Sequence, residues 1–158
     1  MGKINMQKVL IGGLIAGVVL NIVDYVLYGV VLKAQMAAAM QALNKPAIAG
    51  TTILWFVILD FVVGVFLVWL YAAIRPRYGA GPVTAVKAGL AAWFLGGLVN
   101  AAFMWPMAIM PHNLTLVSTA VMLVEFPLAT AVGAKFYMEG AGMGAGMGSA
   151  GAGMGSRM

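Results

Sequence analysis

The sequence predicts an all-α integral membrane protein, a four-helix bundle, and three observations support that fold class. Hydrophobic residues make up 63% of the 158 residues and charged residues only 8%, whereas a soluble domain carries about 25% charged residues. Four apolar runs are each long enough to cross a hydrocarbon core of about 30 Å, which takes roughly 20 helical residues. Backbone groups cannot go unpaired in lipid, so these runs must be helices.

The four predicted spans are residues 9–32, 51–74, 83–109 and 114–138. The first span follows Lys3 and Lys8 as the apolar part of a signal peptide would, but it is too long for one. No small-residue cleavage site follows it at a usable distance, so we predict an uncleaved span. Residues 1–138 then form one four-span membrane domain.

The connection after the first span differs from the other two, which are the short turns "RPRYGAGP" and "MPHN". In this connection Met36, Met40 and Leu43 recur at helical spacing and form one apolar stripe. The stripe predicts a short interfacial helix in the first outer loop, ended by Asn44 and Pro46. A lid over an outward opening is the alternative interpretation.

Lysine and arginine are distributed unevenly between the two sides of the predicted bundle. An even number of spans puts both termini on one side, and that side holds seven basic residues against two on the other. The seven are Lys3, Lys8, Arg75, Arg77, Lys87, Lys135 and Arg157, and the two are Lys33 and Lys45. Because cytoplasmic loops carry the excess of Lys and Arg, we predict that both termini are cytoplasmic.

The last segment, residues 139–158, is rich in Gly and Met and has no apolar face to bury. We expect a flexible cytoplasmic tail. Its methionines are also candidate soft ligands for copper(I), but no His or Cys stands near them, so we favour the plain tail.

Three of the four acidic residues lie inside the predicted spans, at Asp24, Asp60 and Glu125. A helical rise of about 1.5 Å per residue converts sequence position into depth. Each span then contributes one polar residue, with Asn100 in the third, at roughly 12 to 17 Å below the outer surface. We therefore predict one polar layer that crosses the bundle.

Neighbouring positions indicate that these polar groups face inward. Asn21, Asp24 and Tyr28 share one stripe of the first span with glycines, and small residues beside polar ones mark faces where membrane helices pack. Pro106 and Pro127 each leave a backbone carbonyl free near the layer. Carboxylates, amides and free carbonyls together favour the binding of a cation or a proton.

The three carboxylates have no basic residue at their depth, because Lys87 and Lys135 lie near the cytoplasmic ends and can reach that surface. The acids must therefore be protonated or neutralised by a bound cation. Two hypotheses remain open on this basis. The first is a small proton- or cation-handling transporter. The second is a non-catalytic accessory or structural protein whose buried acids hold helices or a partner together, through hydrogen bonds worth about 0.6 to 2 kcal/mol each.

The first hypothesis assigns roles to specific residues. Asp24, Asp60 and Glu125 would bind the ion, and Asn21 and Asn100 would orient them. The spans also show internal sequence similarity. The first contains "GVVLN" and the third "GGLVN", and the second contains "LDF" and the fourth "VEF". This similarity favours two parallel two-helix repeats, which would place Asp60 opposite Glu125.

Three stretches, "GGLIAGVVLNI", "WLYAAIRPRYGAGPVTAVKAGLAAW" and "ATAVGAKFYMEG", resemble a family of small four-helix bacterial inner-membrane proteins of uncharacterised activity. The resemblance covers most of residues 10–140. It is most specific at the turn that contains Tyr71, Arg75, Pro76 and Arg77. The resemblance implies a location in the bacterial inner membrane and supplies no activity, and the Gly/Met tail departs from the family pattern.

Other function classes are disfavoured. His112 is the single histidine, no nucleophile stands with a base, and no Glu-x-x-His spacing accompanies the acids, so we expect neither an enzyme nor a di-iron bundle. Met104, Met107 and Met110 with His112 are a candidate outer copper site, but methionines in membrane helices usually serve packing. The scattered basic residues disfavour nucleic acid. We expect no cofactor, and we expect as partners the lipid bilayer and either a second copy of the chain or a membrane partner protein.

Overall fold

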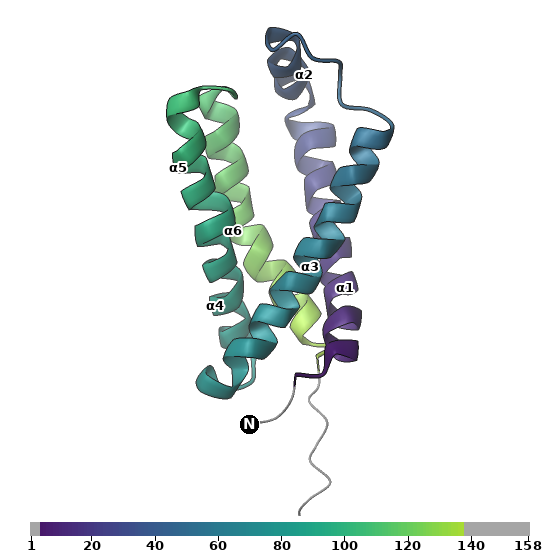
Figure 1. Ribbon diagram of the computed structural model, residues 1–158, viewed down its shortest axis with the longest axis vertical. Coiled ribbons are helices and arrows are strands. Elements are labelled where there is room, and N and C mark those ends of the chain that lie inside the picture. The colour runs from purple at the N-terminus through teal and green to yellow at the C-terminus, as the bar shows by residue number, and fades with distance from the viewer. Residues whose placement is uncertain (1–3, 138–158) are drawn as a thin grey trace, which may run out of the picture.

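The computed structural model describes residues 4–137, and over these residues it is a bundle of helices without strands (Figure 1). Four helical segments are long and apolar enough to cross a bilayer, which confirms the predicted fold class and indicates a multi-pass membrane protein. The four segments are Met6–Val31, Thr51–Tyr78, Pro82–Met107 and His112–Ala134. The predicted Gly/Met tail lies outside the described residues.

The first hairpin begins with α1 (Met6–Asp24), which continues directly into the π-helix η1 (Tyr25–Val31). The Oδ1 atom of Asn5 accepts a hydrogen bond from the backbone N–H of Lys8 at 3.2 Å and so caps the first turn of α1. The predicted loop helix is present as α2 (Lys33–Ala42), and the chain returns along α3 (Thr51–Tyr78).

The second hairpin is less regular in its first half. It consists of α4 (Pro82–Trp93), the π-helix η2 (Phe94–Val99), α5 (Asn100–Met104), the 3₁₀-helix η3 (Trp105–Met107) and α6 (His112–Ala134). Two of the four spans therefore contain a π-helical segment, which the hydropathy pattern did not predict. π-Helical turns are rare and are often found at functional sites.

The turn between the two hairpins is shorter than the sequence indicated. α3 continues through Pro76 to Tyr78, because a proline this close to a helix end removes only one of the last intrahelical hydrogen bonds. Gly79 and Gly81 then make the turn, with φ angles of 85° and 134° that L side chains rarely adopt. The N–H of Gly81 donates to the hydroxyl of Tyr71 at 3.2 Å, which ties the turn to α3.

Glycines allow the helices to approach one another closely in the half of the bundle that contains the termini. A Cβ atom on Gly64 of α3 would collide with the backbone of Gly13 and Gly17 in α1, and one on Gly12 of α1 would lie 2.5 Å from the carbonyl oxygen of Gly133 in α6. Small residues at such crossings are typical of membrane helices. The predicted packing stripe of the first span is therefore a helix contact.

The buried core is confined to part of the bundle. α3 has no buried residue before Gly64, and α5 has none at all, although α4 has five. A second, small cluster of buried residues lies near the opposite end. It consists of Leu27 in η1, Leu32 just before α2, Ala39 in α2 and Leu114 in α6. The bundle is thus closed at the end with the termini and along α1 and α6, and the first half of α3 diverges from α5 (Figure 1).

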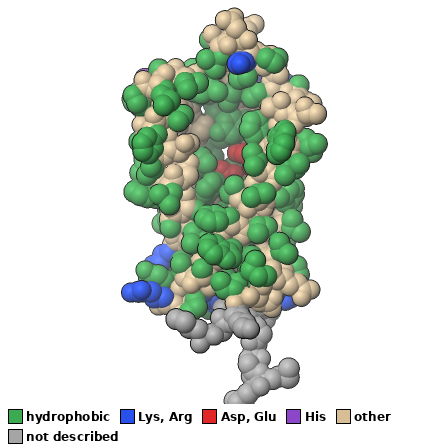
Figure 2. Space-filling model, in the orientation of Figure 1, with side chains coloured by type: hydrophobic (Ala, Val, Ile, Leu, Met, Phe, Trp, Pro, Cys, Tyr) green, Lys and Arg blue, Asp and Glu red, His purple; other side chains and the backbone are tan. Residues whose placement is uncertain are grey.

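Both described ends of the chain meet on one side. The backbone N–H of Asn5 donates to the hydroxyl of Tyr137 at 3.4 Å. Basic side chains gather at this end in the space-filling view, and a smaller basic area is seen at the other end (Figure 2). The hairpins accordingly run in parallel, in the arrangement that two two-helix repeats would give.

Candidate functional site

The three intramembrane acids surround one cavity of about 110 Å³. Asp24 comes from the end of α1, Asp60 from α3 and Glu125 from α6, so three helices each supply one carboxylate. The other lining residues are Leu20, Tyr28, Val63, Met122 and Phe126. The structure thus brings the three predicted acids together, and Asp60 and Glu125 line the same cavity.

Helical spacing explains how the cavity is built. Leu20, Asp24 and Tyr28 are four residues apart and lie on one face of α1 and η1. On α3, Val63 follows Asp60 by three residues, and on α6, Met122 precedes Glu125 by three. Each carboxylate therefore has an apolar or aromatic neighbour from its own helix beside it.

Glu125 is the most buried of the three acids. Its side chain is 3% exposed, and among residues 4–137 no donor gives its carboxylate a hydrogen bond. Asp24 and Asp60 are partly buried and also form no ion pair with a described Lys or Arg. Burying a charge without a partner is costly, so the cavity requires protons or a cation to balance its carboxylates.

The spacing of the carboxylates limits what they can bind together. Within the described part of the chain, no group of three or more His, Cys, Asp or Glu residues is close enough to hold a metal ion. The cavity separates the acids, and most of its wall is apolar. This arrangement suits a proton, or a cation larger than a bare metal ion, better than an oxygen cage for Ca²⁺ or Mg²⁺.

The site is open to the side of the bundle. Figure 2 shows acidic side chains (red) at the bottom of an opening between two columns of hydrophobic side chains (green). The view is perpendicular to the long axis of the bundle, and the opening lies where α3 and α5 diverge (Figure 1). The carboxylates can therefore be reached from the side of the bundle.

The two asparagines predicted to orient the acids lie in different surroundings. The Nδ2 atom of Asn21 donates to the carbonyl of Gly17 at 2.9 Å and to that of Val57 at 3.4 Å, so it links α1 to α3 one turn from Asp24. Asn100 is exposed and does not line the cavity. Its orienting role stays a prediction without a contact to support it.

Tyr28, Pro106 and Pro127, which were also predicted to contribute to the site, lie at different distances from the cavity. Tyr28 lines the cavity from η1, and its side chain lies near Ser118 of α6. Pro127 lies two residues after Glu125, and its Cα atom lies so close to Gly89 that a Cβ there would be 2.5 Å away. Pro106 is in η3, at the end of its span, and is not part of the cavity wall.

Most of the apolar wall of the cavity was missed at the sequence level. Met122 shares the helical stripe of Glu125, but Leu20, Val63 and Phe126 looked like ordinary lipid-facing or packing residues. The signal that could have found Leu20 and Val63 is their spacing of four and three residues from an acid. Phe126 is adjacent to Glu125 in sequence, and no helical spacing would have selected it.

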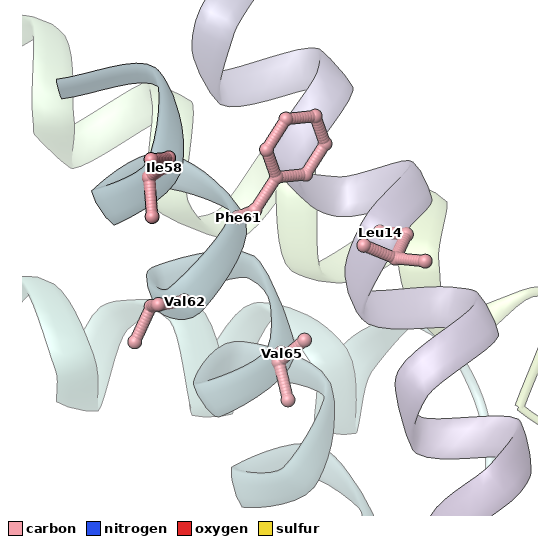
Figure 3. A pocket seen from close by; sticks show the side chains of 5 residues that line it. All are labelled: Leu14, Ile58, Phe61, Val62 and Val65. Atoms are coloured by element: carbon pink, nitrogen blue, oxygen red, sulfur yellow. The ribbon is translucent and has the colours of Figure 1, made fainter. Parts of the chain in front are cut away.

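Two other features of the bundle contain no comparable chemistry. A larger hollow of about 380 Å³ lies between α1 and α3 and is lined by five apolar side chains (Figure 3). It contains no group that binds an ion. His112 stacks on Trp105 with ring centroids 4.1 Å apart, and its Nε2 atom lies 3.2 Å from the Trp105 carbonyl oxygen, so this ring is engaged in the local turn.

Comparison of the chain with protein-family models, with curated proteins and with solved structures found no match. The resemblance to a four-helix inner-membrane family therefore stays a prediction.

Proposed function

We propose that this protein is a small membrane transporter that handles a cation or protons, and that Asp24, Asp60 and Glu125 form its binding site. The observation that carries the proposal is the convergence of three carboxylates from three helices on one cavity, without a basic partner among the described residues. Ionisable groups at membrane depth are rare because they are costly, and they commonly mark ion or proton pathways.

The shape of the bundle supports this function. A transporter needs a central site that is open to one side while the other side is closed. Here the packed core with its glycine crossings closes the end near the termini, and the carboxylates lie where the helices begin to diverge. With the termini in the cytoplasm of an inner membrane, as the distribution of basic residues predicts, this conformation is closed towards the cytoplasm.

The alternative, that the acids serve only as links between helices, expects hydrogen bonds across the bundle. Asn21 of α1 makes such a link to α3, through the carbonyl oxygen of Val57. The carboxylate of Glu125 receives none from a described donor, although it is the most buried acid. This contrast is why we place binding before structural support.

The proposal is tested by flux in proteoliposomes that contain a pH-sensitive dye. Inward gradients of Na⁺, K⁺ or tetramethylammonium are imposed on the parent protein and on the Asp60→Asn/Glu125→Gln double variant. We expect at least one gradient to change the internal pH through the parent and not through the double variant. Gln35→Ala, in the exposed face of α2, is the control and should behave as the parent. Equal responses from the parent and the double variant would refute the proposal.

A further inference from the structure

We propose that the cavity binds a small organic ammonium cation, which reaches it sideways from the bilayer through the opening between α3 and α5. The inference rests on the proposed function, since it names the substrate class of the same carboxylate site.

The cavity wall matches an alkylated ammonium group. Leu20, Val63 and Met122 offer apolar contacts for alkyl substituents, and the rings of Tyr28 and Phe126 stand in the same wall. Aromatic faces attract quaternary ammonium groups through their π-systems. A bare metal ion would gain nothing from these five side chains, and it would need carboxylates closer together than the three acids are.

The volume sets an upper size for the charged head. At about 110 Å³ the cavity is smaller than the 150 Å³ that accommodates benzene in an apolar protein cavity, and larger than the roughly 30 Å³ occupied by one water molecule. It suits a head group of about five heavy atoms, such as trimethylammonium with one further carbon. A longer alkyl chain on that head would extend through the opening.

Charge supports a cation in this position. Glu125 is 3% exposed, lines the cavity and receives no hydrogen bond from a described donor. An ammonium ion without N–H groups can neutralise such a carboxylate at contact distance without donating a hydrogen bond. When it arrives it takes the place of a proton, so binding should release protons.

The direction of entry follows from the distribution of buried residues. No residue of α3 before Gly64 and none of α5 is fully buried, and the opening between them shows the acids to the side of the bundle (Figure 2). An amphiphilic cation collects at the membrane surface with its chain among the lipids. It can then move laterally into the opening without leaving the bilayer.

The test uses dicyclohexylcarbodiimide, a lipid-soluble reagent, on the full-length protein in proteoliposomes. A protonated carboxyl group adds across one C=N bond of the reagent, and the resulting O-acylurea rearranges to a stable N-acylurea, with no leaving group. Mass spectrometry then locates the adduct. We expect it on Asp60 or Glu125, and we expect tetramethylammonium and hexyltrimethylammonium to prevent it at concentrations where Na⁺ and K⁺ do not.

A matched pair of variants separates the aromatic wall from a general effect. Phe126→Leu removes a ring from the cavity and should raise the concentration of tetramethylammonium needed for protection by about 3- to 10-fold. Phe136→Leu makes the same change outside the cavity, at an exposed position after α6, and should leave protection unchanged. Equal protection in both variants would contradict the role given to Phe126.

The outcomes distinguish the inference from the function on which it rests. Protection by Na⁺ or K⁺ but not by ammonium ions would leave a cation site and overturn the ammonium proposal. An adduct that no cation affects would overturn both. The absence of any adduct on the three acids would overturn lateral access, since a reagent dissolved in lipid would then have failed to reach them.

Discussion

Glu125 is the single side chain on which the binding hypothesis depends most, because it is buried, charged when deprotonated and without a described donor. An amide of the same shape needs no counter-charge, so the cost of burying an unpartnered charge is removed. We therefore expect the Glu125→Gln protein, without added cations, to melt at the parent temperature or above it. Thermal unfolding in detergent measures this. A loss of several degrees would show that the carboxylate makes a structural bond.

Asn21 and Asn100 provide a comparison within one residue type. Asn21 bonds to the backbone of its own helix and of α3, whereas Asn100 is exposed. Asn21→Ala should lower the free energy of unfolding by about 1 kcal/mol, the size of a side-chain hydrogen bond between membrane helices. Asn100→Ala should leave it unchanged. Equilibrium unfolding measures both values. If the two variants lost the same free energy of unfolding, Asn100 would make a contact as strong as that of Asn21.

At the scale of helices, the crossing of α1 and α3 has little tolerance for added volume. A Cβ on Gly64 would meet the backbone of α1, while one on Gly96 would have its nearest neighbour, a Phe126 ring carbon, at 3.8 Å. Gly64→Ala should destabilise the bundle by about 1 to 3 kcal/mol, the usual cost of overpacking. Gly96→Ala should be nearly neutral. A stable Gly64→Ala variant, by the same unfolding measurement, would contradict the close crossing.

The four spans and the loop helix could be predicted from sequence because apolar length and helical spacing are local properties. The continuation of α3 through Pro76 and the π-helices η1 and η2 could not. A π-turn is set by how neighbouring helices pack, and a proline near a helix end can belong to the helix or to the turn. Residue types alone did not decide either case.

The sequence predicted which residues would lie at the level of the candidate site, but only partly in which direction their side chains would point. Asp24, Asp60, Glu125 and Tyr28 do face one cavity, as their depth and helical stripes indicated. Asn100 follows directly on η2, and a π-helix has more residues per turn than an α-helix. Regular α-helical spacing therefore does not give the direction of Asn100, and this residue does not line the cavity.

At the scale of the whole molecule, the orientation in the membrane is a prediction from charge. The chain contains no cysteine, so single cysteines can report it. Ala37 in α2 and Ala80 in the turn after α3 are both exposed and lie at opposite ends of the bundle, so each can be replaced by a cysteine. In intact cells an impermeant maleimide should label Ala37→Cys only, and Ala80→Cys should react after permeabilisation. The reverse pattern would place the termini outside and the divergent end of the bundle towards the cytoplasm.

The most direct measurement on the carboxylate site is thermal unfolding of the detergent-purified protein across pH with Na⁺, K⁺ and tetramethylammonium, beside Asp60→Asn and Glu125→Gln. A ligand that binds only the folded state raises the melting temperature with its concentration. We expect at least one cation to do so for the parent, less strongly as the pH falls because protons compete for the same carboxylates, and not for the two variants. Melting curves of the parent that no cation shifts, or shifts that persist in both variants, would contradict a cation site formed by the three carboxylates.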